Sequence, residues 1–215
     1  LQFTRSYGSY VMENILFKIS FPAEFHSQTA AEASVQLHPE VKDRLPEIEK
    51  VVIHTHESAI RIISKSGPLN NPADRDHCLQ YMTAVPLAFG NLVAEDYEDS
   101  FHAANPIIDE LREKMEIHEN PTYSKEYLEP EKRSIANAIQ VFFKDGSSTE
   151  QVEINYPVGH RRRREEGIPL LEEKFKDNLA TRFPAKRSAK IFELCKDQKA
   201  LEQTAVNNFM DLFVI

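Results

Sequence analysis

One short stretch of the chain combines groups that could hold an acid with groups that could move a proton. Asp74, His77 and Tyr81 are spaced three and four residues apart, so on one continuous helix they would share a face. Asn71-Pro72 is a typical helix start, and Arg75 follows in the first turn, where free backbone N–H groups and the helix dipole favour anions. The pattern predicts a carboxylate site. The alternative is structural: Asp74 caps the helix, Arg75 pairs with an acid and Tyr81 hydrogen-bonds at the core edge.

Other candidate residues lie outside this stretch. Lys65, in the polar loop before it, adds a cation that could pair with a carboxylate. His26 follows a proline break and could act as a general acid or base, although a single loop histidine is more often structural. His54 and His56 alternate with Thr55 on a predicted strand and would share a face, but two histidines lack the third ligand of a metal site. We expect them at the surface or near a substrate, without zinc.

A dense basic run occupies positions 160–164, with one histidine followed by four arginines. Such runs can contact nucleic acid. Here Glu165 and Glu166 follow at once and offset part of the charge. We favour a subunit contact or the attraction of an anionic substrate, with a solvated charged turn as the alternative.

The composition is typical of a globular protein with one large domain or two small ones. The 215 residues include 26 Lys and Arg against 34 Asp and Glu, and the net charge of −8 argues against general nucleic-acid binding. Cys78 and Cys195 fit no disulfide framework or zinc pattern, which favours reduced thiols in an intracellular protein. No window approaches the roughly 18 consecutive apolar residues of a membrane span. We expect no metal, no nucleic-acid partner and no membrane contact.

The hydrophobic pattern predicts a minority of strands among helices. Residues 48–56 are β-branched and alternating, and they form the clearest strand. Two more strands, 136–143 and 148–154, flank Asp145-Gly146, a strong hairpin signal. Helices are predicted at 10–17, 27–37, 71–89, 95–101, 106–114, 167–183 and 201–212. This order indicates the α+β class, a two-layer domain with a small, mainly antiparallel sheet packed by helices.

Several longer stretches resemble one known family. Residues 66–81, SGPLNNPADRDHCLQY, are similar to the hallmark stretch of the 2-methylcitrate dehydratases in the MmgE/PrpD family. Further similarities occur in the same order at 10–14, 21–26, 94–99 and 159–169, with Glu173-Lys174-Phe175 after them. Several ordered matches are far more specific than a single short motif.

The resemblance implies a domain order and a reaction. Family members have an all-helical N-terminal domain followed by a smaller α+β domain. Residues 1–40 would then end the helical domain, 41–195 would form the α+β domain, and 196–215 would be a C-terminal helix. The implied activity removes water from 2-methylcitrate to give 2-methyl-cis-aconitate, a step of the methylcitrate cycle in propionate breakdown. The family works without an iron–sulfur cluster, which suits a chain with two scattered cysteines, and we expect no cofactor.

The resemblance also suggests roles for the candidate residues. His77 and Tyr81 match a His-x-x-x-Tyr pattern whose tyrosine lines the active site of related cis-aconitate decarboxylases. His26 lies where relatives place an active-site histidine after a Phe-Pro-Ala turn, and here Glu24 occupies one of the positions that relatives use. An elimination needs a base for a proton next to a carboxylate and an acid for the departing hydroxyl group. We predict His26 and Tyr81 as catalytic proton handlers, and Lys65, Arg75 and His77 as substrate-binding carboxylate clamps.

The remaining expectations concern completeness, partners and rival functions. Because the chain starts at Leu1 and not at a methionine, we expect a fragment with half an active site, inactive alone. The implied partners are a small tricarboxylate and a second copy in a homodimer, in the cytoplasm or, in a eukaryote, the mitochondrial matrix. The alternatives are a related decarboxylase or epimerase of the family, and a non-catalytic assembly domain.

Overall fold

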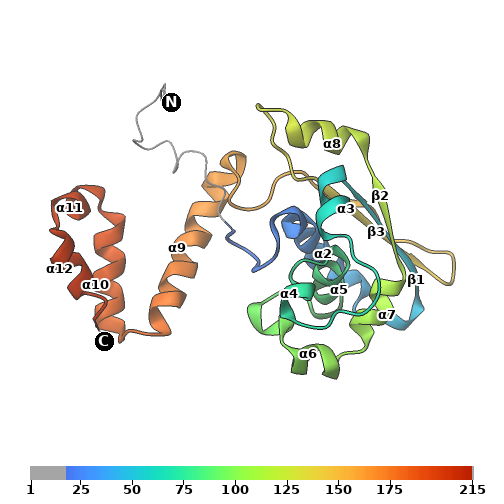
Figure 1. Ribbon diagram of the computed structural model, residues 1–215, viewed down its shortest axis with the longest axis horizontal. Helices are drawn as coiled ribbons and strands as arrows, with labels where there is room; N and C mark the ends of the chain where they lie inside the picture. The colour runs from blue at the N-terminus through green and yellow to red at the C-terminus, as the bar shows by residue number, and fades with distance from the viewer. Residues whose placement is uncertain (1–17, 215) are drawn as a thin grey trace. The chain divides into compact units, whose positions relative to one another are not determined.

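The computed structural model describes residues 18–214, which form two compact units that divide after Arg163 (Figure 1). The helix predicted at 10–17 lies outside the described residues. The first unit contains the sheet and the candidate residues, whereas the second is helical. The predicted domain limits at residues 40 and 195 stay a prediction.

A four-stranded sheet forms one layer of the first unit, in the order β2-β1-β3-β4. The central strand β1 (Ile48–Thr55) pairs in parallel with β2 (Met115–Glu119) and antiparallel with β3 (Asn137–Phe143), and β3 pairs antiparallel with β4 (Val152–Ile154). Ile48, Val51 and Ile53 of β1 are fully buried, whereas Lys50, Val52 and His54 are only partly covered, so one face of the sheet carries the core.

Three helices supply the second layer. The long helices α2 (Gln28–Val41) and α5 (Leu79–Phe89) pack on each other, and α7 (Ile107–Glu113) packs on α5 and β1. Ala30, Ala31 and Ala33 of α2 are completely buried, and their small side chains let α2 lie close to α5 and to the sheet. One cluster of buried apolar residues joins these elements.

Short elements connect the layers and carry most of the polar residues discussed below. They are the 3-10 turns η1 (Phe25–Ser27), η2 (Leu45–Glu47), η3 (Ala94–Tyr97) and η4 (Arg161–Arg163), and the helices α3 (Glu57–Ile63), α4 (Pro72–Arg75), α6 (Asp99–Ala104) and α8 (Pro121–Leu128).

The second unit contains α9 (Arg164–Ala180), α10 (Ala185–Lys196), α11 (Gln198–Gln203) and α12 (Val206–Asp211). Leu179 of α9 packs with Ile191 and Phe192 of α10, and Phe175, Phe183, Leu212 and Phe213 surround them.

The α+β class and the hairpin are confirmed. The turn between β3 and β4 contains Gly146 at φ +85°, a left-handed conformation that glycine adopts at little cost, and its N–H donates to the Phe143 carbonyl at 2.9 Å. The sheet is mixed, because the strand β2, which the pattern does not predict, runs parallel to β1.

The single helix predicted over 71–89 is wrong. The chain forms two helices, α4 and α5, because Cys78 takes an extended conformation (φ −122°, ψ 109°) and starts α5 as its N-cap. Asp74, His77 and Tyr81 therefore do not share a helix face. The helix predicted over 201–212 is likewise divided, because Thr204 and Ala205 are extended between α11 and α12.

Candidate functional site

Asn71 and Pro72 place Arg75 inside the first unit. The Asn71 side chain caps α4 by accepting the Asp74 N–H at 2.9 Å, and Pro72 stands at the start of the helix, as predicted. Arg75 is only 2% exposed. Its Nε donates to the Tyr97 carbonyl at 2.7 Å, and its guanidinium pairs with Asp99, whose side chain is 75% exposed.

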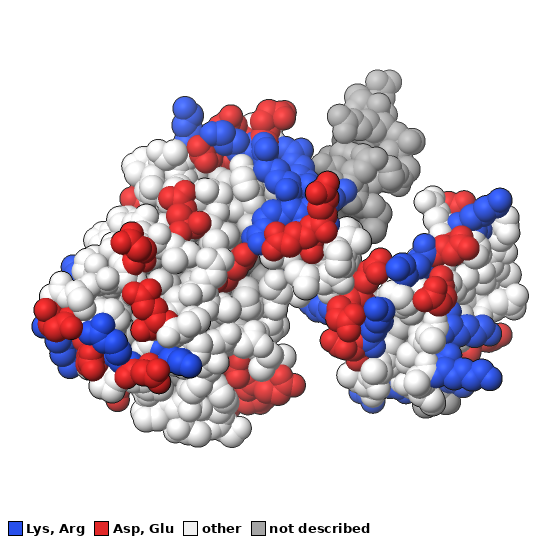
Figure 2. All heavy atoms as spheres, turned by 180° about the vertical axis from the view of Figure 1, so that it is seen from behind, with Lys and Arg blue, Asp and Glu red and all other residues white. Residues whose placement is uncertain are grey.

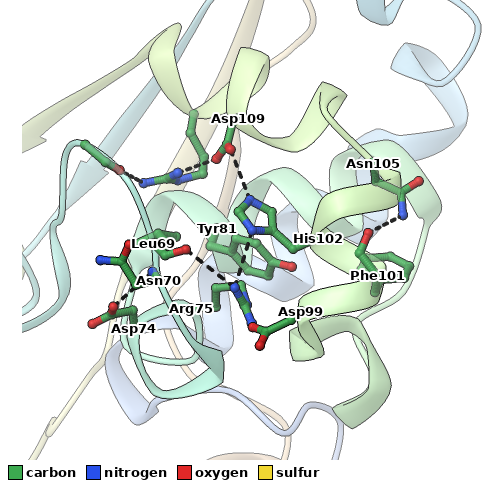
Figure 3. Close-up of polar contacts among 12 residues, drawn as sticks. Leu69, Asn70, Asp74, Arg75, Tyr81, Asp99, Phe101, His102, Asn105 and Asp109 are labelled. Carbon is green, nitrogen blue, oxygen red and sulfur yellow. Dashed lines mark hydrogen bonds and ion pairs between the residues drawn. The ribbon is translucent and has the colours of Figure 1, made fainter.

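A chain of charged side chains extends from Arg75 (Figure 3). The Nη1 of Arg75 lies 3.3 Å from Nδ1 of His102, and Nε2 of His102 lies 3.0 Å from Asp109. Asp109 also pairs with Arg112, which donates to the Gly67 carbonyl at 2.9 Å. Because a guanidinium only donates, His102 accepts at Nδ1 and donates its Nε2 proton to Asp109. We call Arg75, Asp99, His102, Asp109 and Arg112 the Arg75 network.

Tyr81 lies beside this network and is fully buried. Its hydroxyl donates to the Asp96 carbonyl at 2.6 Å, and its ring meets His102 edge-on with 5.5 Å between centroids. Burial raises the pKa of the Tyr81 phenol well above its usual range. The phenol is therefore a hydrogen-bond donor already in use at neutral pH.

The other two predicted carboxylate clamps differ in exposure. Lys65 lines a cavity of about 590 Å³ together with Gly67, Gln80 and Arg112, and its Nζ lies 3.6 Å from Asp74. His77 is exposed, and its Nδ1 lies 2.6 Å from the carboxylate of its neighbour Asp76. The structure thus brings Lys65 near the Arg75 network, whereas the two-helix arrangement leaves His77 at the surface.

His26 belongs to a second cluster, formed by Glu24, His26, His56 and Tyr127, which we call the His26 cluster. Glu24 is the N-cap of η1 and accepts the His26 N–H at 2.8 Å, and its carboxylate lies 2.9 Å from His26 Nδ1. The other ring nitrogen, Nε2, lies 3.2 Å from the Tyr127 hydroxyl. Burial acts to raise the pKa of Glu24, but the hydrogen bond and charge of His26 outweigh it and hold the pKa below its usual value.

His56 is the fourth residue of the His26 cluster, and its ring lies against one face of the Tyr127 ring. It caps α3 by accepting the Ala59 N–H at Nδ1, and its ring stacks on Tyr127 with 4.7 Å between centroids and 6° between planes. Burial, and then the charge of His26, lower its pKa to about 4. Its Nε2 is buried without a hydrogen-bond partner among the described residues.

The residues of the His26 cluster that the sequence did not single out as proton handlers are Glu24, His56 and Tyr127. Glu24 was visible as a departure from the pattern of the relatives. The sequence predicted His56 on the strand, at the surface or near a substrate; it is fully buried and follows β1 as the N-cap of α3. Tyr127 lies on α8, an element that the hydrophobic pattern does not predict, and it stands 101 positions from His26. No local signal in the sequence connects the two.

The basic run is largely engaged by the first unit itself. Arg163 forms a two-pronged pair with Glu32 at 2.8 and 2.9 Å, and Arg161 and Arg162 donate to the Glu131 carbonyl. Figure 2 shows one face of the molecule, on which Lys and Arg side chains gather beside acidic neighbours. These contacts order the segment, and a subunit contact or a role for the run in attracting substrate stays a prediction.

Residues 18–214 contain no group of three or more His, Cys, Asp or Glu side chains arranged to hold a metal ion. No helix among them combines the length and apolar character needed to cross a membrane.

Comparison with known proteins gives the class to which this fold and these residues belong. The model of the MmgE/PrpD C-terminal domain matches residues 21–198, so the chain belongs to the MmgE/PrpD family. The chain is 56% identical over 217 residues to the 2-methylcitrate dehydratase of Escherichia coli (strain K12), and the match covers 100% of this chain and 45% of that protein.

Two further relatives show the same relation. The 2-methylcitrate dehydratase of Cupriavidus necator is 54% identical, with 100% of this chain and 45% of the relative covered. The mitochondrial 2-methylcitrate dehydratase of Yarrowia lipolytica is 51% identical, with 99% of this chain and 41% of the relative covered. The chain therefore spans less than half the length of the curated relatives that it matches.

Proposed function

We propose that this chain forms the C-terminal part of a hydro-lyase that removes water from 2-methylcitrate to give 2-methyl-cis-aconitate, in the methylcitrate cycle of propionate catabolism. The observation that carries the proposal is the 56% identity over the whole chain to a 2-methylcitrate dehydratase. The rest of the active site would lie on the part of the relatives that this chain does not match, so we expect the 215 residues to have negligible activity alone.

His26 is the proton-handling residue that the geometry supports best. It is held by Glu24 and lies next to the Tyr127 hydroxyl, so its ring has a fixed orientation and a proton-exchanging neighbour. Tyr81 has the same predicted role, but its hydroxyl is already donated to the Asp96 carbonyl. The turnover of a Tyr81 variant decides between the two uses of this phenol.

The substrate is a tricarboxylate, and cationic side chains would hold its carboxylates. Lys65 is partly exposed in its cavity and could turn from Asp74 to a ligand. Arg75 already holds the exposed carboxylate of Asp99, which a substrate carboxylate could replace. His77 is accessible at the surface. We propose Lys65, Arg75 and His77 as the residues that contact the substrate carboxylates. We also propose that the protein forms a homodimer, located in the cytoplasm or, in a eukaryote, in the mitochondrial matrix.

A chimaera tests the proposed function. The segment of the Escherichia coli relative that this chain matches is replaced by the 215 residues, and the absorbance of the conjugated product is followed with 2-methylcitrate as substrate. We expect turnover by the chimaera, and a loss of about 100-fold or more in His26→Ala. His118→Ala, which removes an exposed imidazole on β2, is the control and should leave turnover unchanged.

The proposed function is wrong if a folded chimaera leaves 2-methylcitrate unchanged while the intact relative converts it under the same conditions. Turnover of the 215-residue chain alone at the rate of the intact relative would contradict the expectation of an incomplete site.

A further inference from the structure

Both ring nitrogens of His26 are occupied. Nδ1 lies 2.9 Å from the Glu24 carboxylate and Nε2 lies 3.2 Å from the Tyr127 hydroxyl, while the His26 side chain is only 10% exposed. A substrate therefore reaches neither nitrogen without displacing a partner. A proton that enters or leaves His26 has to pass through one of these two neighbours.

Tyr127 is the neighbour that can meet a substrate. It lies near the end of α8 and is partly exposed, whereas its ring is fixed from the inside by the parallel ring of His56. The Glu24 carboxylate already contacts His26 twice, at the backbone N–H and at Nδ1. The phenol thus combines a fixed position, an accessible side and a hydroxyl that contacts an imidazole.

The turn that carries His26 is also fixed. The His26 carbonyl accepts the Asn137 Nδ2 donor at 2.8 Å, and Ser27 Oγ donates to the Glu24 carbonyl at 2.7 Å. Gln28 donates to the carbonyls of Phe21 and Ala23. Because the backbone on both sides of His26 is held, the positions of Glu24 and His26 are built into the fold.

We propose that Tyr127 is the catalytic residue that exchanges the proton with the substrate, and that Glu24 and His26 form a relay behind it. This inference rests on the proposed function, and it changes the atom that meets the substrate from a ring nitrogen of His26 to the phenolic oxygen of Tyr127. Glu24 is then a positioning residue, because it acts only through His26.

The protons balance in the proposed elimination of water. Glu24 accepts the Nδ1 proton of His26, so the neutral ring has its lone pair at Nε2, where the Tyr127 O–H donates. The Tyr127 oxygen takes the proton from the substrate carbon as its own proton moves to Nε2. The electron pair of the C–H bond forms the double bond, and the pair of the C–O bond leaves with the hydroxyl group. The departing hydroxyl group takes one proton from solvent and leaves as water, while the imidazolium releases its extra proton to solvent, so no proton is gained or lost.

The relay follows the logic of a carboxylate–imidazole–hydroxyl triad. The carboxylate sets the tautomer of the ring and stabilises the imidazolium that forms when the hydroxyl gives up its proton. Here the buried His56 ring supports the phenol from behind, and its lowered pKa keeps it uncharged beside the imidazolium of His26. A second charged ring next to His26 would oppose the transfer.

Kinetics of the chimaera described above test the role of Tyr127. We expect Tyr127→Phe to lower kcat by about 100-fold or more with KM changed by less than about threefold, because the ring stack is kept and only the hydroxyl is lost. Tyr123→Phe is the matched control: it removes a hydroxyl from the same helix, one turn earlier, where the ring is buried with Ala136 and Ala138. Its kcat should stay within about twofold of the unmodified value.

Glu24 variants test the relay behind Tyr127. Glu24→Gln should lower kcat by about tenfold or more, and Glu24→Asp should recover part of it, since the carboxylate and not the bulk of the side chain sets the ring. A kcat of Tyr127→Phe within about twofold of the unmodified chimaera would overturn the inference while leaving the proposed function in place.

A measurement that does not depend on turnover tests the relay separately from the proposed function. The ¹⁵N resonances of the His26 ring in the 215-residue chain report which nitrogen carries the proton. We expect a protonated Nδ1 and an unprotonated Nε2, with the Nε2 resonance displaced in Tyr127→Phe. A neutral ring protonated at Nε2 would overturn the relay even if the chimaera is active. A chimaera without turnover would remove the proposed function, and with it the catalytic role of Tyr127, whatever the tautomer.

Discussion

The Arg75 network and the His26 cluster are built from the same kinds of side chain but end differently. Each contains a histidine with a carboxylate on one ring nitrogen and a second polar group on the other. In the Arg75 network the second group is a buried guanidinium that is itself bound to Asp99 and to the Tyr97 carbonyl. In the His26 cluster the second group is the hydroxyl of Tyr127, a partly exposed residue.

This difference separates a network that supports the fold and could hold a carboxylate from a cluster that could transfer a proton. His102 donates a hydrogen bond to Asp109 and accepts one from the Arg75 guanidinium, which gives up no proton near neutral pH. His102 therefore has no route for proton transfer. His26 faces a hydroxyl, which both donates and accepts. The stretch 66–81, which resembles the family most closely, thus contributes Arg75 and its network. The proton transfer that we propose takes place where His26 meets Tyr127, two residues that are far apart in the sequence.

The largest effect that we expect on stability comes from Arg75→Met. The variant leaves the Tyr97 carbonyl without its donor and removes the ion pair with Asp99, and unsatisfied buried groups each cost about 1–3 kcal/mol. We expect the free energy of unfolding to fall by about 3 kcal/mol in urea titration. Lys50→Met is the control, because Lys50 forms a solvent-exposed pair with Glu116, and such pairs contribute little to stability. Equal losses in the two variants would contradict the role of Arg75 in supporting the fold.

A smaller effect, about 2 kcal/mol, should appear in the pH dependence of stability through His56. Its pKa is lowered from 6.5 to about 4 in the folded chain, so between these values the unfolded chain binds one more proton. The stability contributed by neutral His56 is therefore complete above pH 6.5 and is lost as the pH falls toward 4. From pH 6.5 to pH 5 the loss is about 2 kcal/mol.

His56→Asn removes this titration and keeps a good helix-capping side chain at the start of α3. Its free energy of unfolding should fall less than that of the unmodified chain over the same pH interval. His118→Asn, at an exposed position, should leave the pH dependence unaltered. Parallel pH curves for His56→Asn and the unmodified chain would show that His56 is not held neutral by burial.

The sequence predicts local structure where a residue acts through its own backbone. Asp145-Gly146 predicts the hairpin because few residues adopt the required left-handed conformation, and Asn71-Pro72 predicts the capped start of α4. The break at Cys78 was not predictable, because the helical spacing of Asp74, His77 and Tyr81 continues across it. The pattern does not predict the strand β2, because Met115–Glu119 is short, has only two apolar residues, Met115 and Ile117, and directly follows the helix predicted over 106–114.

The candidate site was predictable only in part. The Phe-Pro-Ala turn marked His26, and the helix start at Asn71-Pro72 drew attention to Arg75, whereas its partners Asp99 and His102 were not predicted. Tyr127 was not found, since a contact across 101 positions depends on the packing of α8 near α3 and not on any pattern within α8. Spacing also grouped His77 with Tyr81, which the two-helix structure separates.

The smallest effect on stability is expected for Tyr81, which lies beside the Arg75 network. Its Phe variant can be compared directly with that of Tyr127 in the His26 cluster. The Tyr81 hydroxyl makes one hydrogen bond, to the Asp96 carbonyl, so Tyr81→Phe should lower the free energy of unfolding by about 1 kcal/mol. If that bond is the whole role of the phenol, kcat of the chimaera stays within about threefold of the unmodified value, which is the result we expect from the geometry. Tyr127→Phe should show the reverse, with stability nearly unchanged and kcat strongly reduced. A loss of kcat of about 100-fold in Tyr81→Phe would instead assign the proton transfer to Tyr81, as the His-x-x-x-Tyr pattern predicts, and would move the reaction from the His26 cluster to the Arg75 network.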